Sequence, residues 1–302
     1  MQPASLDTLR LPAHVLAEQL ASGRVKSVQL VQGFLERITR HDATLGSFSA
    51  VYTEAVRAAE AADQAIACGH RIGPLHGIPV MVKDLFDIDG KVTMCGSKVW
   101  EHRVAERTAT VVRRLIGAGL IVIGKNKTAE FAASAYGTNK HMGTPRNPWD
   151  LESHRAPGGS SSGTGAAVAA SLGPWGVGTD TGGSVRIPAS WCGITSLKTT
   201  IGRISTHGVH PLAESLDTPG PMCRDAQDCA LLLDVLQGPD PLDPRTLRCS
   251  PNDPFATLKR GAMGLVIGTL QAAEREMVEP EVLAAYDEGS RTLPNLDAQV
   301  LE

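Results

Sequence analysis

The sequence predicts an α/β protein, in which helices pack around a central β-sheet. Short apolar segments that suit buried strands alternate along the chain with longer segments whose apolar residues recur at helical spacing. The composition is that of an ordinary globular protein, with 42% hydrophobic and 20% charged residues among 302. This length allows one large domain or two small ones.

The charge balance and the cysteines argue against several classes of function. The net charge is -3 at pH 7 and no basic stripe is visible, so we expect no direct binding of nucleic acid. No segment looks like a signal peptide or a membrane span. None of the six cysteines forms a C-x-x-C pair, which argues against a zinc or redox motif. We therefore expect a cytoplasmic protein without a membrane partner.

The first seventy residues predict a helical region, residues 1–70, within the same domain. Ser27 suits a helix N-cap, and apolar residues follow at helical spacing from Val28 to Ile38. An alanine-rich segment, Val51 to Ala67, predicts a second helix. This region offers no candidate catalytic residue.

The next segments predict strands of the sheet. Ile78 to Val82 is a short apolar strand candidate that places Lys83 and Asp84 at its carboxyl end. Ligands of open α/β sheets gather at the carboxyl ends of strands. A helix at residues 111–118 and a buried strand at residues 120–124 follow.

The chain is organised around the stretch from Gly158 to Pro188. Two glycine clusters, residues 158–165 and 182–184, are separated by a small-residue helix pattern and a short strand candidate. Glycine at this density costs conformational entropy, which a chain tolerates where its backbone must turn tightly or approach a ligand. Ser160 lies in the first cluster and Ser184 in the second, and we expect both hydroxyls to converge on one reacting atom.

The remaining elements continue the alternation of helices and strands. Helices are predicted at Pro188–Cys192, Ala226–Leu236 and Pro280–Thr292, and strands at Gly264–Leu270 and Ala298–Leu301. Residues 238–253 are rich in Pro and Asp, and they predict a surface loop more than a domain boundary.

Three other kinds of functional site can be rejected from the sequence around their motifs. Residues 159–163 match G-x-S-x-G, but the polar segment from Leu151 to Pro157 cannot supply the preceding strand that a nucleophile elbow around Ser161 needs. The glycine cluster lacks the G-K-[ST] ending of a phosphate loop. The nine histidines show no ligand spacing, so we expect no metal site.

A serine and a lysine remain as candidate chemistry. A serine hydroxyl needs an adjacent base, and a lysine serves as one only when it is neutral. Burial lowers the pKa of lysine, and Lys83 at a strand end walled by glycine loops suits that condition. The backbone N–H groups of Thr181, Gly182, Gly183 and Ser184 suit an oxyanion hole. On pattern alone, a purely structural glycine turn remains the alternative.

Several long motifs occur in a fixed order. They are G-I-P-V-M-V-K-D at residues 77–84, P-G-G-S-S-S-G-T-G-A-A-V-A-A at 157–170, and G-T-D-T-G-G-S-V-R-I-P-A at 178–189. With these motifs the chain resembles the amidase signature family of serine hydrolases. The resemblance implies a central mixed β-sheet flanked by helices on both faces, with a helical N-terminal region. It also implies a Ser–Ser–Lys triad that needs no cofactor.

The resemblance assigns the triad residue by residue. The family's nucleophile falls on Ser184, the bridging serine on Ser160, and the base on Lys83. In the family the bridging serine follows a cis peptide bond, which here would join Gly159 to Ser160. The implied oxyanion hole consists of the backbone N–H groups of residues 181–184.

Two departures from the family pattern stand out. Ser162 replaces a glycine, which would strain the backbone if that position needs a positive φ. Family members are also longer, so we expect residues 1–302 to form a single amidase domain that lacks its C-terminal part. A sheet edge and apolar surface would then be exposed.

Three functions are compatible with these observations. The first is a stand-alone amidohydrolase that cleaves a small-molecule amide to an acid and ammonia. The second is the glutamine-hydrolysing A subunit of a tRNA-dependent amidotransferase, which needs partner subunits. The third is a catalytically silent fragment that only binds a partner. No motif fixes the substrate or the oligomeric state, and a homo-oligomer is compatible with the sequence.

Overall fold

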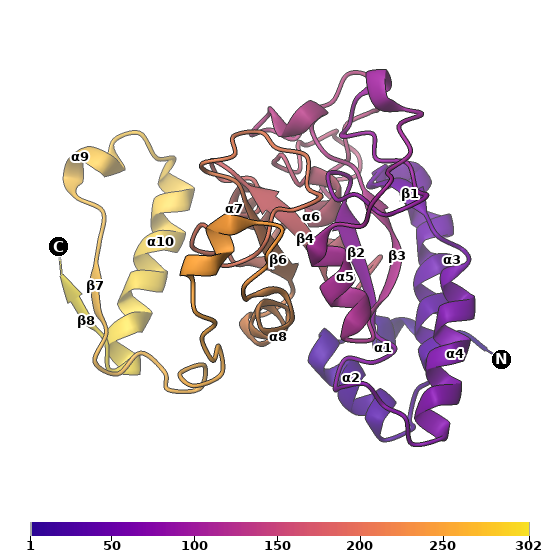
Figure 1. Cartoon of the computed structure of the whole chain (residues 1–302). Coiled ribbons are helices and arrows are strands. Elements are labelled where there is room, and N and C mark those ends of the chain that lie inside the picture. The colour runs from indigo at the N-terminus through magenta and orange to yellow at the C-terminus, as the bar shows by residue number, and fades with distance from the viewer. Residues whose placement is uncertain (1, 302) are drawn as a thin grey trace. The chain divides into compact units, whose positions relative to one another are not determined.

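The computed structural model describes residues 2–301, which form two compact units (Figure 1). The first unit extends to Asn252 and the second begins at Asp253. The division falls within residues 238–253, the segment for which the sequence favoured a surface loop.

The first unit is built on a six-stranded mixed sheet with the strand order β1-β3-β2-β4-β6-β5. The central strands β2, β3 and β4 run parallel, and β1, β5 and β6 pair antiparallel with their neighbours. The α/β class with a mixed sheet is therefore confirmed. The strands are β1 (Phe48–Val51), β2 (Pro79–Lys83), β3 (Ile121–Asn126), β4 (Gly176–Asp180), β5 (Thr195–Ser196) and β6 (Thr218–Cys223).

Helices flank this sheet and share one large apolar core with it (Figure 1). The small-residue helix α6 packs on β2, β3, β4 and β6, while α5 contacts β3 and α8 contacts β5 and β6. The helices are α1 (Leu6–Leu9), α2 (Ala13–Ala21), α3 (Ser27–Leu45), α4 (Ala55–Ala67), α5 (Thr110–Gly117), α6 (Ser162–Ala169), α7 (Arg186–Cys192) and α8 (Ala226–Leu236). Short 3₁₀ helices lie at Lys98–Trp100, Glu130–Ala132 and Pro244–Arg248.

The N-terminal seventy residues differ from the prediction in three details, the first being that the helix predicted from Val51 begins only at Ala55. They include a strand, β1, whose alternation is too short to stand out between two helices. The N-cap of α3 is Lys26, and Ser27 is already helical. The Ser27 hydroxyl instead donates to Gly77 O at 2.6 Å, so this serine ties the helix to the loop before β2.

Strand β6 lies inside the sheet although the sequence pattern gave no sign of it. It contains Pro219 and Pro221, residues that usually mark edge strands because they lack an N–H group. Leu197 N donates to Pro221 O, so the main chain of Pro221 faces β5 and not β4. Because strand β5 has only two residues, few hydrogen bonds between β5 and β6 are lost through the missing N–H groups of the two prolines.

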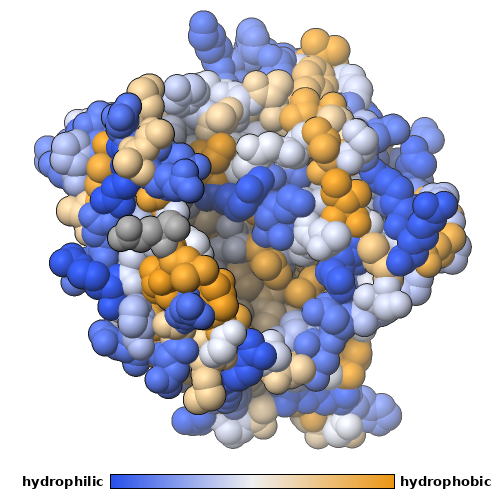
Figure 2. Space-filling view, turned by 90° about the vertical axis from the view of Figure 1, so that its left-hand side faces the viewer, coloured by the Kyte–Doolittle hydropathy of each residue, from blue (hydrophilic) through white to orange (hydrophobic). Residues whose placement is uncertain are grey.

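The second unit contains a two-stranded parallel sheet and two helices. Its elements are β7 (Val266–Gly268), α9 (Ala272–Arg275), α10 (Pro280–Thr292), a 3₁₀ helix at Leu293–Leu296, and β8 (Gln299–Leu301). Several of its large apolar side chains are exposed, including those of Met263, Val266 and Met277. Figure 2 shows exposed apolar residues gathered in places among hydrophilic ones. Within residues 2–301, no helix has the length and apolar character needed to cross a membrane.

Candidate active site

Lys83 ends strand β2, at the carboxyl edge of the sheet where the sequence placed it. The strand is buried along its whole length, because parallel neighbours cover both of its edges and helices cover its faces. The Lys83 Nζ atom lies 2.7 Å from Ser160 Oγ and 2.8 Å from Thr179 Oγ1. Two hydroxyls therefore hold the amine, and no carboxylate forms an ion pair with it among the residues that the structure describes.

This environment favours a neutral amine. Burial lowers the pKa of Lys83 from its usual 10.5 to about 7, and the more distant charges of Asp180 and Asp217 oppose the shift only in part. Near neutral pH a substantial fraction of the amine is thus unprotonated. Such an amine has a lone pair that can accept a proton from the Ser160 hydroxyl.

The first glycine cluster turns just before Ser160. The peptide bond between Gly159 and Ser160 is cis, as the family resemblance implies. Ser161 is not placed for chemistry, because its hydroxyl donates to Thr179 O and accepts from Thr179 N in the adjacent strand. Ser162 begins α6 with an ordinary negative φ, so a side chain at this position brings no backbone strain.

Ser184 lies on the loop between β4 and α7, and its side chain is nearly buried. Ser161 N donates to Ser184 O at 3.1 Å, which joins the two glycine clusters directly. Within residues 2–301 the Ser184 hydroxyl makes no hydrogen bond. The structure therefore contains the hydrogen bond between Lys83 and Ser160 but none between Ser160 and Ser184.

The loop from Thr181 to Ser184 presents a set of backbone donors. Gly183 N donates to Asp180 Oδ1 at 2.8 Å, so this N–H group is engaged and does not point at a ligand. The N–H groups of Thr181, Gly182 and Ser184 have no acceptor in the described chain. Three of the four donors that we expected for an oxyanion are therefore free.

Asp180 holds this loop in shape. Its fully buried carboxylate accepts from Gly183 N and Val185 N and forms a two-pronged ion pair with Arg186. Burial alone would raise the pKa of Asp180, but the hydrogen bonds from Arg186, Val185 and Gly183 outweigh it and lower the pKa. This role was not predicted from the sequence, although an Asp shortly before a glycine pair is a residue type that often accepts hydrogen bonds from the backbone of a following turn.

The glycines of the site allow backbones to touch. A Cβ atom on Gly159 would lie 2.4 Å from Gly137 N, and one on Gly137 would lie 2.3 Å from Gly158 O. Gly183 has a φ of +132°, and a Cβ there would meet Ile187 Cδ1 at 2.7 Å. Glycine is thus needed at these positions because neighbouring atoms lie where a Cβ atom would be, and not because the chain must be flexible.

A second buried lysine lies beside the first but in a different environment. Lys125, on β3, donates to Val92 O at 2.8 Å and Thr93 Oγ1 at 2.6 Å. Its Nζ lies 3.4 Å from Asp84 Oδ1, which has no hydrogen-bond partner in the described residues. Burial raises the pKa of Asp84 to about 6, with Lys125 acting against the shift. Lys125 therefore pairs with a buried carboxylate, whereas the Lys83 amine forms hydrogen bonds only with hydroxyls among the described residues.

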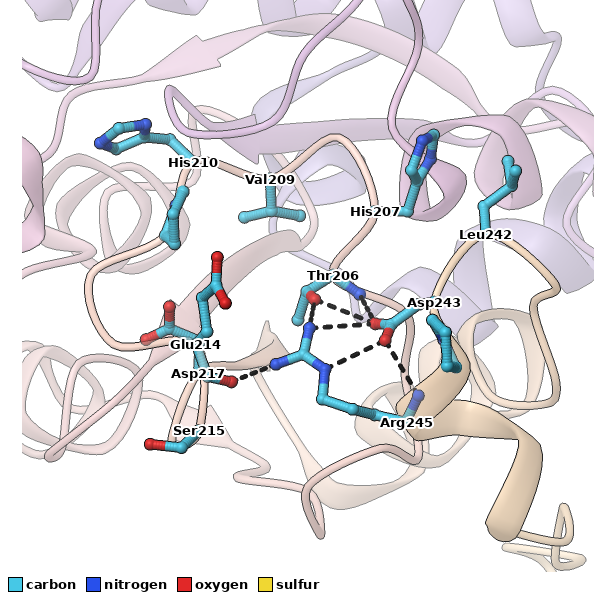
Figure 3. A pocket seen from close by; sticks show the side chains of 12 residues that line it. Thr206, His207, Val209, His210, Glu214, Ser215, Asp217, Leu242, Asp243 and Arg245 are labelled. Carbon is cyan, nitrogen blue, oxygen red and sulfur yellow. Dashed lines mark hydrogen bonds and ion pairs between the residues drawn. The ribbon is translucent and has the colours of Figure 1, made fainter.

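A cavity of about 630 Å³ is lined by residues of the segments 206–217 and 242–245 (Figure 3). Asp217 lines it and accepts a hydrogen bond from the Thr181 hydroxyl, and Arg245 lies on its wall with its guanidinium paired to Asp243. A smaller hollow lined by Thr179 and Thr181 shares four residues with this cavity, namely Thr206, Val209, His210 and Asp217. Lys83, Ser160 and Ser184 do not line the larger cavity.

His14, Asp225 and Asp228 form a cluster of potential metal ligands that the sequence spacing did not reveal. Asp228 already accepts from Ala13 N at 2.7 Å and His14 N at 2.8 Å, so it caps the start of α2. Asp225 caps α8 by accepting from Asp228 N. These carboxylates therefore have a structural use that needs no ion.

A buried amine in contact with a serine hydroxyl, beside a loop of free backbone donors, is typical of hydrolases that use a serine nucleophile. Comparison with known proteins agrees with this class. The Amidase family model matches residues 29–302, and the chain therefore belongs to the Amidase family.

Similar proteins include components of amidotransferases as well as amidases. The A subunit of the glutamyl-tRNA(Gln) amidotransferase of Chromohalobacter salexigens is 44% identical over 288 residues, which cover 95% of this chain and 59% of that protein. A structure described as a vestigial protein complex that reveals the origins of an s-triazine catabolic enzyme is 38% identical, with a TM-score of 0.89 over 96% of this chain and 63% of the other. The peptide amidase of Stenotrophomonas maltophilia is 31% identical, with a TM-score of 0.88 over 96% and 61%.

These shares show that the chain spans about three fifths of the length of the relatives that it matches. The fold of that portion agrees closely, as the two TM-scores show.

Proposed function

We propose that this protein hydrolyses an amide C–N bond through a Ser184 acyl-enzyme. The observation that carries the proposal is the contact between the buried Lys83 amine and the Ser160 hydroxyl at 2.7 Å. A lysine with no paired carboxylate and a pKa of about 7 has little structural value, because burying it costs stability. Its placement is explained if it takes up and returns a proton.

In the proposed reaction, Lys83 takes the Ser160 proton while Ser160 takes the proton of Ser184. The Ser184 oxygen then forms a bond to the amide carbon, and the negative charge on the carbonyl oxygen faces the loop of free N–H groups. The C–N bond breaks as the proton returns through Ser160 to the leaving nitrogen. Water next attacks the ester, and the carboxylate product leaves with Ser184 restored.

For the substrate we propose the side-chain amide of glutamine, with the ammonia used by a partner protein. The sequence alone favoured a stand-alone amidase, but the relatives at 39–44% identity are amidotransferase A subunits, which supports the second hypothesis over the first. The similar structure described as a protein complex also supports a partner. Hydrolysis of other carboxamides is the second candidate, supported by the likeness to peptide amidase.

The cavity in Figure 3 suits an amino-acid substrate. The Glu214 side chain lines it without an ion-pair partner in the described chain, and a free carboxylate there would attract the α-ammonium group of glutamine. A Glu214→Gln change should therefore raise KM for glutamine and leave KM for uncharged amides unchanged.

Ammonia release from glutamine, amino-acid amides, aliphatic amides and aromatic amides tests the proposal. Ser184→Ala should abolish release, and Lys83→Ala and Ser160→Ala should each reduce it by orders of magnitude. Ser162→Ala is the matched control, since it removes a buried hydroxyl without a hydrogen-bond partner from the same serine run. If Ser184→Ala keeps its activity, the assignment of the nucleophile is wrong.

A folded protein that acts on none of these amides would instead favour the catalytically silent fragment. Release from glutamine alone would favour the amidotransferase component. Release from other amides and not from glutamine would favour the stand-alone amidase.

A further inference from the structure

A second cavity, of about 460 Å³, has the features of an anion site. It lies between the helical N-terminal region, the end of α6 and the loop that carries Trp149. Its polar lining consists mainly of Arg10, Arg37, His41, Thr44 and Ser171. None of these residues belongs to the proposed catalytic machinery.

All ionisable side chains that line this cavity are basic. Among the described residues, no carboxylate lines it, and Arg10, Arg37 and His41 take part in no ion pair within 4.0 Å. Burial, followed by the charges of Arg10 and Arg40, lowers the pKa of Arg37. Burial, followed by the charges of Arg37 and Arg40, lowers the pKa of His41. Arg10 and Arg37 thus bring positive charge to the cavity without an ion-paired carboxylate in the described chain, and the charge of Arg37 disfavours protonation of His41.

Arg37 is fixed in place before any ligand arrives. Its Nε donates to Ser171 O and its Nη2 donates to Ala170 O, each at 2.9 Å, at the carboxyl end of α6. Within the described residues its Nη1 has no partner. A guanidinium held in this way offers a rigid donor to a phosphate or carboxylate at a small entropic cost.

Trp149 adds an aromatic wall to the same cavity. The indole N–H donates to Cys192 O at 2.8 Å, and the ring edge packs against Gly193. The residue is nevertheless 76% exposed. An anchored and exposed indole provides a stacking surface for a planar ring, and such stacking does not depend on a particular base.

We propose that this cavity binds a phosphate monoester that carries an aromatic ring, with the phosphate among Arg10, Arg37 and His41 and the ring on Trp149. A mononucleotide has this chemistry. The net charge of -3 and the absence of a wider basic stripe favour a small ligand over a nucleic-acid strand. The proposal is independent of the amidase reaction.

Isothermal titration of the full chain with AMP, inorganic phosphate and adenosine tests the proposal. AMP should bind most tightly, inorganic phosphate more weakly, and adenosine not measurably. Arg10→Gln should weaken AMP binding by about tenfold or more, because one charge-assisted hydrogen bond is lost. Trp149→Leu should weaken the binding of AMP and leave that of phosphate unchanged. Arg57→Gln, on the exposed side of α4, is the matched control.

The Arg10 side chain makes no hydrogen bond in the described chain, so Arg10→Gln should fold normally. Arg37→Gln loses two contacts to α6 and is checked by circular dichroism before its binding is compared. Failure of AMP to bind, or equal binding by wild type and Arg10→Gln, would overturn the proposal. Phosphate that binds as tightly as AMP would overturn the role of Trp149.

Discussion

The pKa of Lys83 gives the sharpest prediction, because it ties the rate of hydrolysis to pH. The proposed base works only as a neutral amine, and its pKa is about 7. Lysine is neutral above its pKa, so activity should rise with pH. Between about pH 8 and about pH 6 the neutral fraction falls from about nine tenths to about one tenth, so kcat/KM should drop about tenfold.

The assay is ammonia release from glutamine at subsaturating concentration across this pH range. Asp217→Asn should move the acid limb to lower pH, because the charge of Asp217 raises the pKa of Lys83. A flat profile between about pH 6 and 8, or a limb near the usual lysine pKa, would refute Lys83 as the base.

The same shift also predicts how stability depends on pH. The folded-state pKa of Lys83 is depressed, so between about 7 and 10.5 the unfolded chain holds more protons than the folded one. The free energy of unfolding should therefore increase as the pH rises through that window. Below it, the protonated Lys83 should destabilise the folded state by about 5 kcal/mol at most. Lys83→Met should be inactive yet more stable than wild type near neutral pH, as urea denaturation would show.

Three further predictions follow from the contacts of the site. Gly183→Ala should lose most activity, because it places a Cβ atom on a backbone with positive φ and against the Ile187 side chain. Gly182→Ala should keep its activity, because the space around Gly182 is open. Equal rates of hydrolysis for the two variants would contradict this explanation. Thr179→Val removes one of the two hydroxyls on the predicted base and should lower kcat about tenfold without raising KM, which steady-state kinetics can separate. Lys125→Met leaves the buried Asp84 without its cation and should cost about 3–5 kcal/mol in urea unfolding at neutral pH; a change below about 1 kcal/mol would mean that Asp84 is already neutral.

Elements with strong local patterns were predicted closely from the sequence. Helix α8 and helix α10 have the predicted bounds, and β2 (Pro79–Lys83) lies one residue later at each end than the predicted strand, Ile78–Val82. Strands β1 and β6 were missed for physical reasons. Strand β1 is only four residues long and lies between two helices. Strand β6 carries two prolines, whose missing N–H groups cost little because the neighbouring strand β5 has only two residues.

The candidate site shows the same division between local and non-local information. The contact between Lys83 and Ser160 joins residues 77 positions apart, and it could be predicted only because long motifs identified the family. The engagement of Gly183 with Asp180 depends on the rotamer of one carboxylate, which no spacing rule reports. The charge environment that separates Lys83 from Lys125 likewise depends on which neighbours each amine meets in space.

The packed glycine backbones at Gly137, Gly158 and Gly159 have a consequence for how this protein can be altered. A Cβ on Gly137 would meet the backbone of Gly158, one on Gly159 would meet the backbone of Gly137, and one on Gly158 would meet the backbone of Pro188, so no substitution at any of the three is free of a backbone clash. This part of the site should therefore stay invariant in any selection for activity. Libraries that seek new substrates gain nothing by including these three codons, and diversity is better directed to Gly182, around which the structure leaves room.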